Sequence, residues 1–497
     1  MSGAMVRVRL EPSSVEIDVP RGAELLSALA QHGFEFPCGG TGLCGGCSVR
    51  VLGGELAVTQ ADREVFNAEE LAAGWRLACQ ARVEEPLTLE CRQWRMDVLA
   101  DDARLASAGR RGFGIAIDLG TTTIAAQLID LAAGSVLRVE TDLNPQAAFG
   151  ADVMSRIKAA LAGGDLTAVV RGALRRMVAS LAEGHAGEIV EVVLVGNTVM
   201  HHLFAGLDVE PLAHVPFETS HAETQRFTAG DLGWPLTATC AIRFERCLGS
   251  FVGSDILAGI VAVGMHRAED LIALVDLGTN GEIAIGNRDG IVCASAAAGP
   301  AFEAGAIRMG MRATTGAVWR VQVADGQMRA SVIGDAEPQG ICGSGVVDAV
   351  AAGLQSGAIL ASGRIADGSK RFGVAGTVVL SQADIRELQL AKGAIASGFK
   401  LLLRRIGAKV GGLKSIYLAG AFGNYVQMES ALRIGLLDAR GDILHAAGNT
   451  ALRGAKMLLL ADVEPALPKI EHVSLAADPG FQDEFAACMT FPEHSSR

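Results

Sequence analysis

Hydrophobic and polar positions alternate in two different ways along the chain. Residues 6–10 and 15–19 alternate with a period of two, which predicts a β-hairpin, and residues 23–32 are typical of a short helix. Beyond residue 113, strand-like stretches alternate with helix-like ones, and residues 189–195 are apolar throughout, as in a sheet covered on both faces. The stretches with helical spacing are residues 152–162, 166–183, 382–407 and 449–459.

One short pattern occurs twice in this larger region. Residues 115–123 read IAIDLGTTT and residues 272–286 read IALVDLGTNGEIAIG, so each copy is an apolar strand that ends in Asp-Leu-Gly-Thr. Glycine allows a tight turn, backbone N–H groups in such a turn bind phosphate, and an adjacent Asp holds Mg²⁺ through water. The repetition indicates a duplicated domain whose two hairpins clamp one nucleotide. The predicted residues are Asp118, Gly120, Thr121, Thr122 and Thr123 in the first copy and Asp276, Gly278, Thr279, Asn280 and Glu282 in the second.

A third stretch, residues 416–425, reads IYLAGAFGNY, and residues 192–199 and 340–347 supply glycine-containing strand ends. Together these pieces resemble the acetate kinase, sugar kinase, Hsp70 and actin superfamily (ASKHA). The resemblance implies a two-lobed α/β fold of the actin type that binds ATP and Mg²⁺ between its lobes. It also implies that the adenosine lies against Gly420, Ala421, Phe422 and Gly423. The catalytic carboxylate that positions the attacking water stays open among Asp118, Asp276 and Glu282.

Four cysteines are grouped in the first 80 residues. Cys38, Cys44 and Cys47 share a glycine-rich loop with the spacing C-x₅-C-x₂-C, and Cys79 follows on a distant predicted strand. Four thiolates in this arrangement hold a [2Fe–2S] cluster. Zinc is the alternative, but zinc ribbons favour paired CxxC knuckles, and Cys79 has no such partner. Residues 5–92 resemble a plant-type ferredoxin of the β-grasp fold, in which the first spacing is one residue shorter.

Composition narrows the partners and the location. The chain has 497 residues and a net charge of −12, which argues against nucleic acid or an anionic membrane as the main partner. The first residues lack the apolar region of a secretory signal, and the longest apolar segment, residues 256–265, is too short to span a bilayer. We therefore expect a cytoplasmic protein.

These patterns predict an α+β ferredoxin domain followed by a two-lobed α/β domain of the ASKHA, RNase H-like class. The expected boundaries are residues 1–95 for the ferredoxin domain, 96–112 for a linker, 113–265 for lobe I and 266–497 for lobe II. Such a linker would let the ferredoxin domain move by tens of ångströms, at about 3.3 Å per extended residue.

Four other side chains invite a chemical interpretation. His201 and His202 are adjacent on a predicted helix, so we expect one buried and one exposed histidine rather than a metal site. Glu303 follows a Gly-Pro turn and is either close to the nucleotide or an ordinary first-turn acid. Cys342 stands between two glycines, which favours packing in a tight strand-to-helix corner over redox chemistry.

An electron carrier joined to an ATPase has a physical use. A plant-type cluster has a potential near roughly −400 mV, and a tenfold change in a one-electron equilibrium is about 59 mV. An acceptor of much lower potential is therefore reduced only if an ATP-driven conformational change shifts the equilibrium.

The whole motif set, including LACQ around Cys79, GNTVMHHL, GPAFEAGA and GICGSG, resembles the reductive activators of corrinoid-dependent enzymes. The resemblance implies an ATP-hydrolysing iron–sulfur enzyme that reduces inactive Co(II) corrinoid to Co(I). Its partner would be a corrinoid protein or a cobalamin-dependent methyltransferase, and a reductase or another ferredoxin would supply the electron. The oligomeric state stays open, with a homodimer among the options.

Two other functions remain open at this point. The chain would also suit an electron activator of another low-potential enzyme such as a radical dehydratase, although such activators carry a [4Fe–4S] cluster bridged by cysteines. A small-molecule kinase regulated by a ferredoxin is the other alternative, and it requires an acidic base in a substrate pocket.

Overall fold

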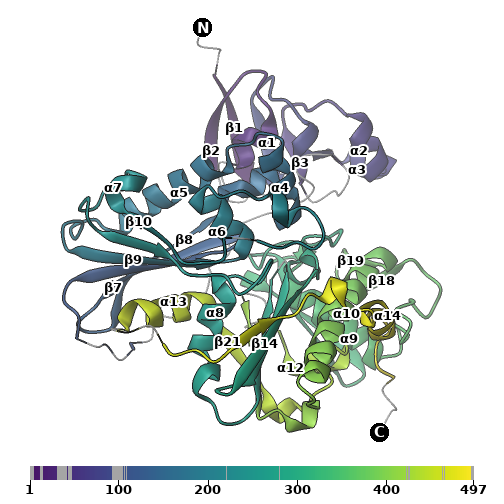
Figure 1. The fold of residues 1–497 in the computed structure, drawn as a ribbon. Helices are drawn as coiled ribbons and strands as arrows, with labels where there is room; N and C mark the ends of the chain where they lie inside the picture. The colour runs from purple at the N-terminus through teal and green to yellow at the C-terminus, as the bar shows by residue number, and fades with distance from the viewer. Residues whose placement is uncertain are drawn as a thin grey trace.

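The computed structural model has a small N-terminal domain above two larger α/β lobes (Figure 1). The predicted cluster ligands Cys38 and Cys44 and the predicted nucleotide residues Thr279, Ala421 and Phe422 lie outside the residues it describes. The described residues are 5–11, 15–30, 42, 47–91, 104–105, 107, 109–150, 152–219, 221–278, 280–420, 423, 426–461, 463 and 465–493.

The first domain is a mixed five-stranded sheet in the order β2-β1-β5-β3-β4. The predicted hairpin is confirmed, since β1 pairs antiparallel with β2, and β1 also pairs parallel with β5. Alternate residues of β1 are buried, and the helix α1 covers that face with Leu25 and Leu29. The elements are β1 (Met5–Glu11), β2 (Val15–Pro20), α1 (Leu25–Ala30), β3 (Ser48–Gly53), α2 (Gln60–Val65), α3 (Ala68–Ala72), β4 (Trp75–Leu77), the 3₁₀ turn η1 (Ala78–Gln80) and β5 (Leu87–Cys91).

Lobe I contains a six-stranded sheet in the order β10-β11-β9-β6-β7-β8. Its central strands are buried on both faces, which is why their sequences are continuously apolar. The elements are β6 (Phe113–Leu119), β7 (Thr123–Asp130), β8 (Ser135–Leu143), η2 (Pro145–Phe149), α4 (Val153–Leu161), α5 (Leu166–Leu181), β9 (Ile189–Gly196), α6 (Thr198–Ala205), η3 (Glu210–Leu212), β10 (Gln225–Thr228), α7 (Ala229–Leu232), β11 (Ala241–Phe244), α8 (Ser254–Ala262) and η4 (Met265–Arg267).

Lobe II contains a second six-stranded sheet in the order β21-β20-β12-β13-β14-β22, with smaller sheets beside it. The long predicted helix is α10, which starts at a capping box between Ser381 and Asp384. The elements are β12 (Ile272–Leu277), β13 (Gly281–Asn287), β14 (Gly290–Ala296), η5 (Pro300–Glu303), β15 (Ala317–Ala324), β16 (Gln327–Val332), η6 (Ile333–Asp335), β17 (Gly340–Ile341), α9 (Gly343–Gln355), β18 (Arg371–Ala375), β19 (Val378–Ser381), α10 (Gln382–Arg405), η7 (Val410–Gly412), β20 (Ser415–Ala419), α12 (Met428–Arg433), η8 (Gly441–Ile443), β21 (Leu444–Gly448), α13 (Thr450–Leu460), β22 (Ile470–His472), η9 (Leu475–Ala477) and α14 (Phe481–Met489).

The two large sheets repeat the same pairing, which confirms the predicted duplication. In lobe I, β6, β7 and β8 form an antiparallel meander, and β9 lies parallel to β6. In lobe II, β12, β13 and β14 form the same meander, and β20 lies parallel to β12. Each Asp-Leu-Gly-Thr motif therefore ends the first strand of its meander, at the corresponding place in both lobes.

Two helices cross between the lobes. α8 packs one face against the lobe I sheet and the other against the lobe II sheet. α13 follows β21 in lobe II but packs on the lobe I sheet, where Figure 1 shows it in yellow. The two helices touch at Gly454, where a Cβ would lie 2.0 Å from the backbone oxygen of Ala258.

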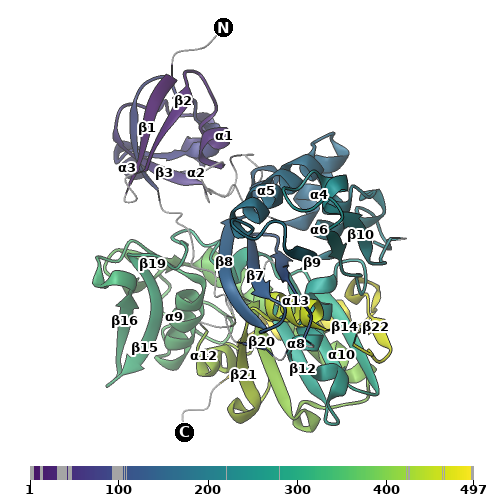
Figure 2. The ribbon, with the colours of Figure 1, turned by 90° about the vertical axis from the view of Figure 1, so that its left-hand side faces the viewer.

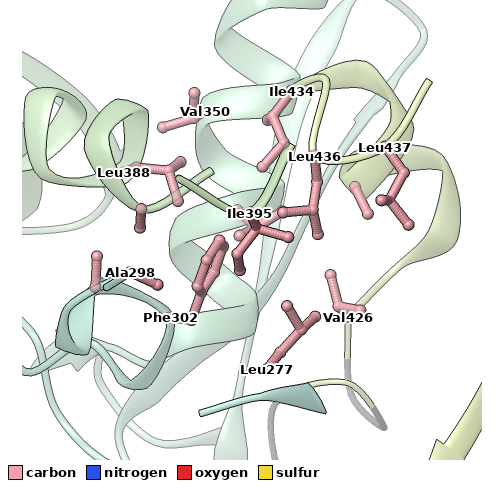
Figure 3. Close-up of a cluster of buried hydrophobic side chains, with 14 of the residues drawn as sticks. Leu277, Ala298, Phe302, Val350, Leu388, Ile395, Val426, Ile434, Leu436 and Leu437 are labelled. Atoms are coloured by element: carbon pink, nitrogen blue, oxygen red, sulfur yellow. The ribbon is translucent and has the colours of Figure 1, made fainter. Parts of the chain in front are cut away.

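The core of lobe II reaches the end of the second Asp-Leu-Gly-Thr strand. Phe302 of η5 packs among Leu277, Ile395 and Val426, as Figure 3 shows. Leu277 is the last residue of β12, so this packing anchors η5 beside the second predicted phosphate hairpin.

The second half of the predicted linker is fixed to lobe I. Arg104 Nε donates a hydrogen bond to the backbone oxygen of Ala133 at 2.8 Å, and Leu105 N donates to Gly134 O at 3.0 Å. Arg110 Nη1 donates to Leu459 O in α13 at 2.8 Å. The chain is thus tied to lobe I from residue 104 onward. None of the helices that the structure describes combines the length and apolar character needed to cross a membrane.

Candidate functional site

Carboxylates from both lobes converge where the two meanders face each other. Asp118 is the penultimate residue of β6, and Asp276 is the penultimate residue of β12. The charge of Asp118 raises the pKa of Asp276, which requires the two carboxylates to lie close together. The structure therefore brings together the predicted pair from the two lobes.

Asp118 has a hydrogen-bond donor from the far end of the chain. Asn449 Nδ2 donates to Asp118 Oδ2 at 2.9 Å, while Asn449 Oδ1 accepts from Leu452 N and caps α13. Burial raises the pKa of Asp118 to about 6, and the Asn449 amide limits the rise because it stabilises the ionised form.

Asp276 has a more acidic environment. Burial, and then the fields of Asp118 and Glu303, raise the pKa of Asp276 to about 7. Gly420 has a φ of +84°, and a Cβ there would lie 2.6 Å from Asp276 Oδ1. The predicted glycine is therefore required, but its structural partner is the carboxylate of the second hairpin.

Glu282 lies opposite Asp276 in the β12–β13 pairing and is buried. Burial raises its pKa well above the usual value, the charges of Asp255 and Asp276 add to the rise, and a hydrogen bond from Asn280 opposes it. Burial and the neighbouring carboxylates therefore disfavour the ionised form of Glu282.

Asp255 is a fourth carboxylate that the sequence analysis missed. It lies in the first turn of α8, where Ser254 Oγ accepts a hydrogen bond from Gly196 N at 3.1 Å and holds the helix against the end of β9. Burial raises the pKa of Asp255 to about 8, the Ile256 backbone N–H opposes the rise, and Asp276 and Asp118 add to it. The sequence feature that could have identified Asp255 is its position directly before the apolar segment 256–265.

The two predicted phosphate hairpins also meet through Glu303. Thr122 Oγ1 and Glu303 Oε2 are 3.4 Å apart, and Glu303 lies beside Gly278 of the second hairpin. The first hairpin is held from below by Asn144, whose Nδ2 donates to Gly120 O and whose N donates to Thr122 O, both at 2.9 Å. Glu303 is thus both a first-turn acid of η5 and a neighbour of the two predicted hairpins, and its closeness to a nucleotide stays a prediction.

These carboxylates do not form a ready-made metal cage. Among the described residues, no three His, Cys, Asp or Glu side chains are grouped so that they could hold a metal ion alone. Mg²⁺ usually keeps several waters and takes one or two carboxylates together with substrate phosphates. The arrangement fits a cation that binds together with a nucleotide.

Two of the predicted cluster ligands lie side by side. Ser48 pairs with Leu77, and Ala78 N donates to Cys47 O at 3.0 Å, which brings Cys47 next to Cys79. Cys79 lies on the turn η1 rather than on a strand, and Gln80 Nε2 donates to its sulfur at 3.5 Å. An amide donor to sulfur suits a cluster ligand.

Asp62 positions this turn. Its Oδ2 accepts from Thr59 N at 2.7 Å and completes the capping box of α2, while its Oδ1 accepts from Leu77 N at 2.7 Å.

The histidine expectation was wrong. His201 and His202 are both fully buried, because α6 is covered on both sides. His202 is held between Thr198 O at 2.8 Å and Thr219 Oγ1 at 2.6 Å, and burial lowers the pKa of His201 to about 4. The prediction for Cys342 is confirmed, since it is buried at the N-cap of α9 directly after β17.

Comparison with known proteins covers all three parts of the chain. Residues 270–497 match the family described as the C-terminal domain of RACo, the ASKHA domain, and residues 113–268 match the RACo middle region. Residues 8–84 match the 2Fe-2S iron-sulfur cluster binding domain. The corrinoid activation enzyme RamQ of Eubacterium limosum is 37% identical over 412 residues, which are 75% of this chain and 69% of that protein. The chain belongs to the RACo family.

Two further similarities agree with this family. A [Co(II) methylated amine-specific corrinoid protein] reductase of Methanosarcina barkeri is 27% identical over 76% of this chain and 77% of its own length. The solved structure of a reductive activator for corrinoid, iron-sulfur protein matches 98% of both chains with a TM-score of 0.69 and 27% identity. The RACo-family fold of this chain is thus a ferredoxin-type domain followed by an ASKHA-type domain, as predicted.

Proposed function

We propose that this chain is an ATP-dependent reductive activase that reduces Co(II) corrinoid to Co(I) on a separate corrinoid protein or cobalamin-dependent methyltransferase. The observation that carries the proposal is one chain in which a ferredoxin-type domain contacts both lobes of an ASKHA-type domain. The similarity to the corrinoid activation enzyme RamQ and to the M. barkeri corrinoid protein reductase supports a corrinoid acceptor. They favour this function over a radical-dehydratase activator or a kinase.

The cluster ligands in this proposal are Cys38, Cys44, Cys47 and Cys79. A bound [2Fe–2S] cluster would supply a one-electron carrier, with a reductase or another ferredoxin as the donor. The neighbouring positions of Cys47 and Cys79 and the amide of Gln80 support this assignment.

We propose different roles for the individual carboxylates at the nucleotide. Asp118 has a pKa of about 6, lower than those of Asp255 and Asp276, so it is mainly ionised at neutral pH. We assign Asp118 and Asp276 to Mg²⁺, one from each lobe. The carboxylate that accepts the proton of the attacking water stays open among Asp118, Asp276 and Glu282, and the buried Asp255, whose charge acts on Glu282, joins these candidates. Glu282 lies opposite Asp276 on β13 and is placed to position that carboxylate.

The test uses the reconstituted full chain under argon with a chemical reductant, Mg²⁺, ATP and a Co(II) corrinoid protein. We expect the Co(II) absorbance to disappear only when ATP is present and Cys79 is intact. Cys79→Ser should abolish the reduction, because it removes a cluster ligand. Cys240→Ser, at a buried cysteine in lobe I, is the matched control and should retain it.

Iron and labile sulfide are measured in the same preparations, with about two of each expected per chain for a [2Fe–2S] cluster. Stoichiometric zinc without visible absorbance would refute the cluster. Corrinoid reduction at the same rate without ATP would refute the activase.

A further inference from the structure

In the described part of the chain, the ferredoxin domain contacts η2 of lobe I and Arg308 of lobe II, and each of these segments leads to a predicted phosphate hairpin. In Figure 2 the domain lies above the lobes, with α4 and α5 of lobe I on one side and β19 of lobe II on the other. On lobe I, α1 lies against η2. On lobe II, Glu70 of α3 forms an ion pair with Arg308 at 2.5 Å.

The lobe I contact leads directly to the first hairpin. η2 begins at Asn144, which caps it by accepting from Gln146 N at 3.0 Å. The same Asn144 donates from its side chain to Gly120 O and from its backbone to Thr122 O. A shift of η2 therefore moves the turn that is predicted to bind phosphate.

The lobe II contact leads to the second hairpin through a short, tightly bonded segment. Arg308 lies five residues after Glu303, whose carboxylate is 3.4 Å from Thr122 Oγ1. Between them, Gly305 N donates to Pro300 O and Ile307 N donates to Ala304 O. Ala304 has a φ of +59°, and a Cβ on Gly310 would lie 1.9 Å from Ala304 O, so the segment has little room to deform. Phe302 anchors it in the core beside Leu277, as Figure 3 shows.

The contact itself is electrostatic and well oriented. Glu70 Oε2 accepts from Asn67 N at 2.9 Å and completes the capping box of α3, which leaves Oε1 for Arg308. Burial acts to raise the pKa of Glu70, but the Asn67 hydrogen bond and the charges of Arg308 and Arg371 outweigh it and lower the pKa. Arg308 N in turn donates to Asp384 Oδ1 at 2.7 Å, at the start of α10.

We propose that Arg308 and Arg371 form a docking surface for the chain's own ferredoxin domain, and that bound Mg²⁺-nucleotide releases the domain from it. The inference rests on the proposed ATP-dependent function. A phosphate at Thr122 places negative charge where the Glu303 carboxylate lies, so Glu303 must move, and its movement is passed to Arg308. Closure of the lobes also changes the separation between η2 and Arg308, and a rigid ferredoxin domain cannot keep both contacts.

The release serves electron transfer. A domain held against both lobes is not free to reach a separate protein. Only residues 92–103 separate β5 from the first residue that is fixed to lobe I, so the released domain moves within roughly 40 Å, at about 3.3 Å per extended residue.

Because binding coupling is reciprocal, a weaker docking contact must strengthen nucleotide binding. Glu70→Gln and Arg308→Gln are tested in the reconstituted full chain without a corrinoid partner, with a non-hydrolysable ATP analogue and Mg²⁺. Glutamine keeps the capping box of α3 but removes the charge. We expect each variant to lower the Kd roughly two- to fivefold, the range of a partly exposed ion pair. The double variant should show no further gain, because both changes remove the same contact.

Two controls separate docking from general charge effects. Arg308→Lys should bind the analogue like the unaltered chain because it keeps the charge, and so should Arg440→Gln, which removes an exposed arginine paired with Asp442. Hydrogen exchange of the unaltered chain should become faster in residues 68–72 when the analogue binds. An unchanged or higher Kd in both glutamine variants, an equal effect of Arg440→Gln, or unchanged or slower exchange would overturn the proposal.

Failure of this inference is distinguishable from failure of the proposed function. Neither measurement contains a corrinoid. If the response is missing while ATP-dependent corrinoid reduction is intact, only the proposed nucleotide-dependent docking is refuted. A clear hydrogen-exchange response without corrinoid reduction would support the nucleotide-dependent docking and refute the proposed corrinoid acceptor.

Discussion

The two lobes have the same strand pairing, yet the carboxylates at the ends of their first strands differ in pKa. Asp118 of lobe I receives an amide hydrogen bond from Asn449, and its pKa rises only to about 6. Asp276 of lobe II faces Asp118 and Glu303, and its pKa rises to about 7. The difference comes from neighbours that lie outside the duplicated motif.

The comparison shows that the duplicated motif sets where each aspartate lies, whereas segments outside the motif set its pKa. Both aspartates occupy the same place in their meanders. Among the described residues, a side-chain donor reaches Asp118 alone of the two, and it caps α13, the helix that crosses from lobe II to pack on lobe I. The two carboxylates therefore differ in pKa although their strands pair in the same way.

The largest effect is expected when one of the two aspartates, Asp118 or Asp276, is replaced. Asp276→Asn should reduce ATP hydrolysis roughly 100-fold or more, because removing one group that stabilises charge at a reacting centre has that order of effect. Asp118→Asn should cost the same order if both lobes hold the cation. The cluster absorbance should not change, since the first domain has its own core. Asp325→Asn, at an exposed position of lobe II, is the matched control. Normal hydrolysis in Asp276→Asn would contradict the site.

An intermediate effect concerns pH. A carboxylate whose folded pKa is raised stabilises the fold when protonated, and this stability is lost as pH rises through the folded pKa. The pKa values of Asp276 and Asp255 are about 7 and about 8. The nucleotide-free protein should therefore become progressively less stable as the pH rises from about 6.5 to about 8.5. Asp276→Asn should reduce this loss by about 1 kcal/mol, at 1.36 kcal/mol per pKa unit.

Thermal unfolding of both proteins at several pH values measures this difference. The comparison between them cancels the contribution of other groups that titrate in the same range, such as Lys392, whose pKa burial lowers to about 8. An equally steep pH dependence in the variant would show that Asp276 is not protonated in this range.

The smallest expected effect sharpens the role of the lobe I donor. Asn449→Ala removes both the cap of α13 and the amide on Asp118, and should destabilise the fold by about 1 kcal/mol. Asn449→Ser keeps a capping oxygen but loses the amide. Its stability should be near that of the unaltered chain, while its affinity for Mg²⁺-ATP falls, because the pKa of Asp118 rises. Equal nucleotide affinity in the unaltered chain and both Asn449 variants would show that Asn449 has no role in nucleotide binding.

Local patterns in the sequence determined most of the architecture. The period-two alternation before residue 20 and the twofold Asp-Leu-Gly-Thr motif depend on residues close together in the chain, so the hairpins β1–β2, β6–β7 and β12–β13 could be predicted. The helices α4, α5, α10 and α13 follow from apolar spacing and capping residues for the same reason. The family resemblance, carried by motifs spread over the chain, supplied the ASKHA fold that the comparisons confirm.

Only the tertiary structure decided which side chains lie near Asp118 and Asp276. Asn449 and Asp118 are 331 residues apart, and no periodicity connects them. In the sequence Asp255 is an ordinary first-turn acid, and only the structure places α8 between the two sheets and Thr122 beside Glu303. The two buried histidines show the same limit, because burial of α6 depends on what covers it. Local spacing fixes which face a residue occupies, but the packing of distant segments determines its neighbours and hence its charge.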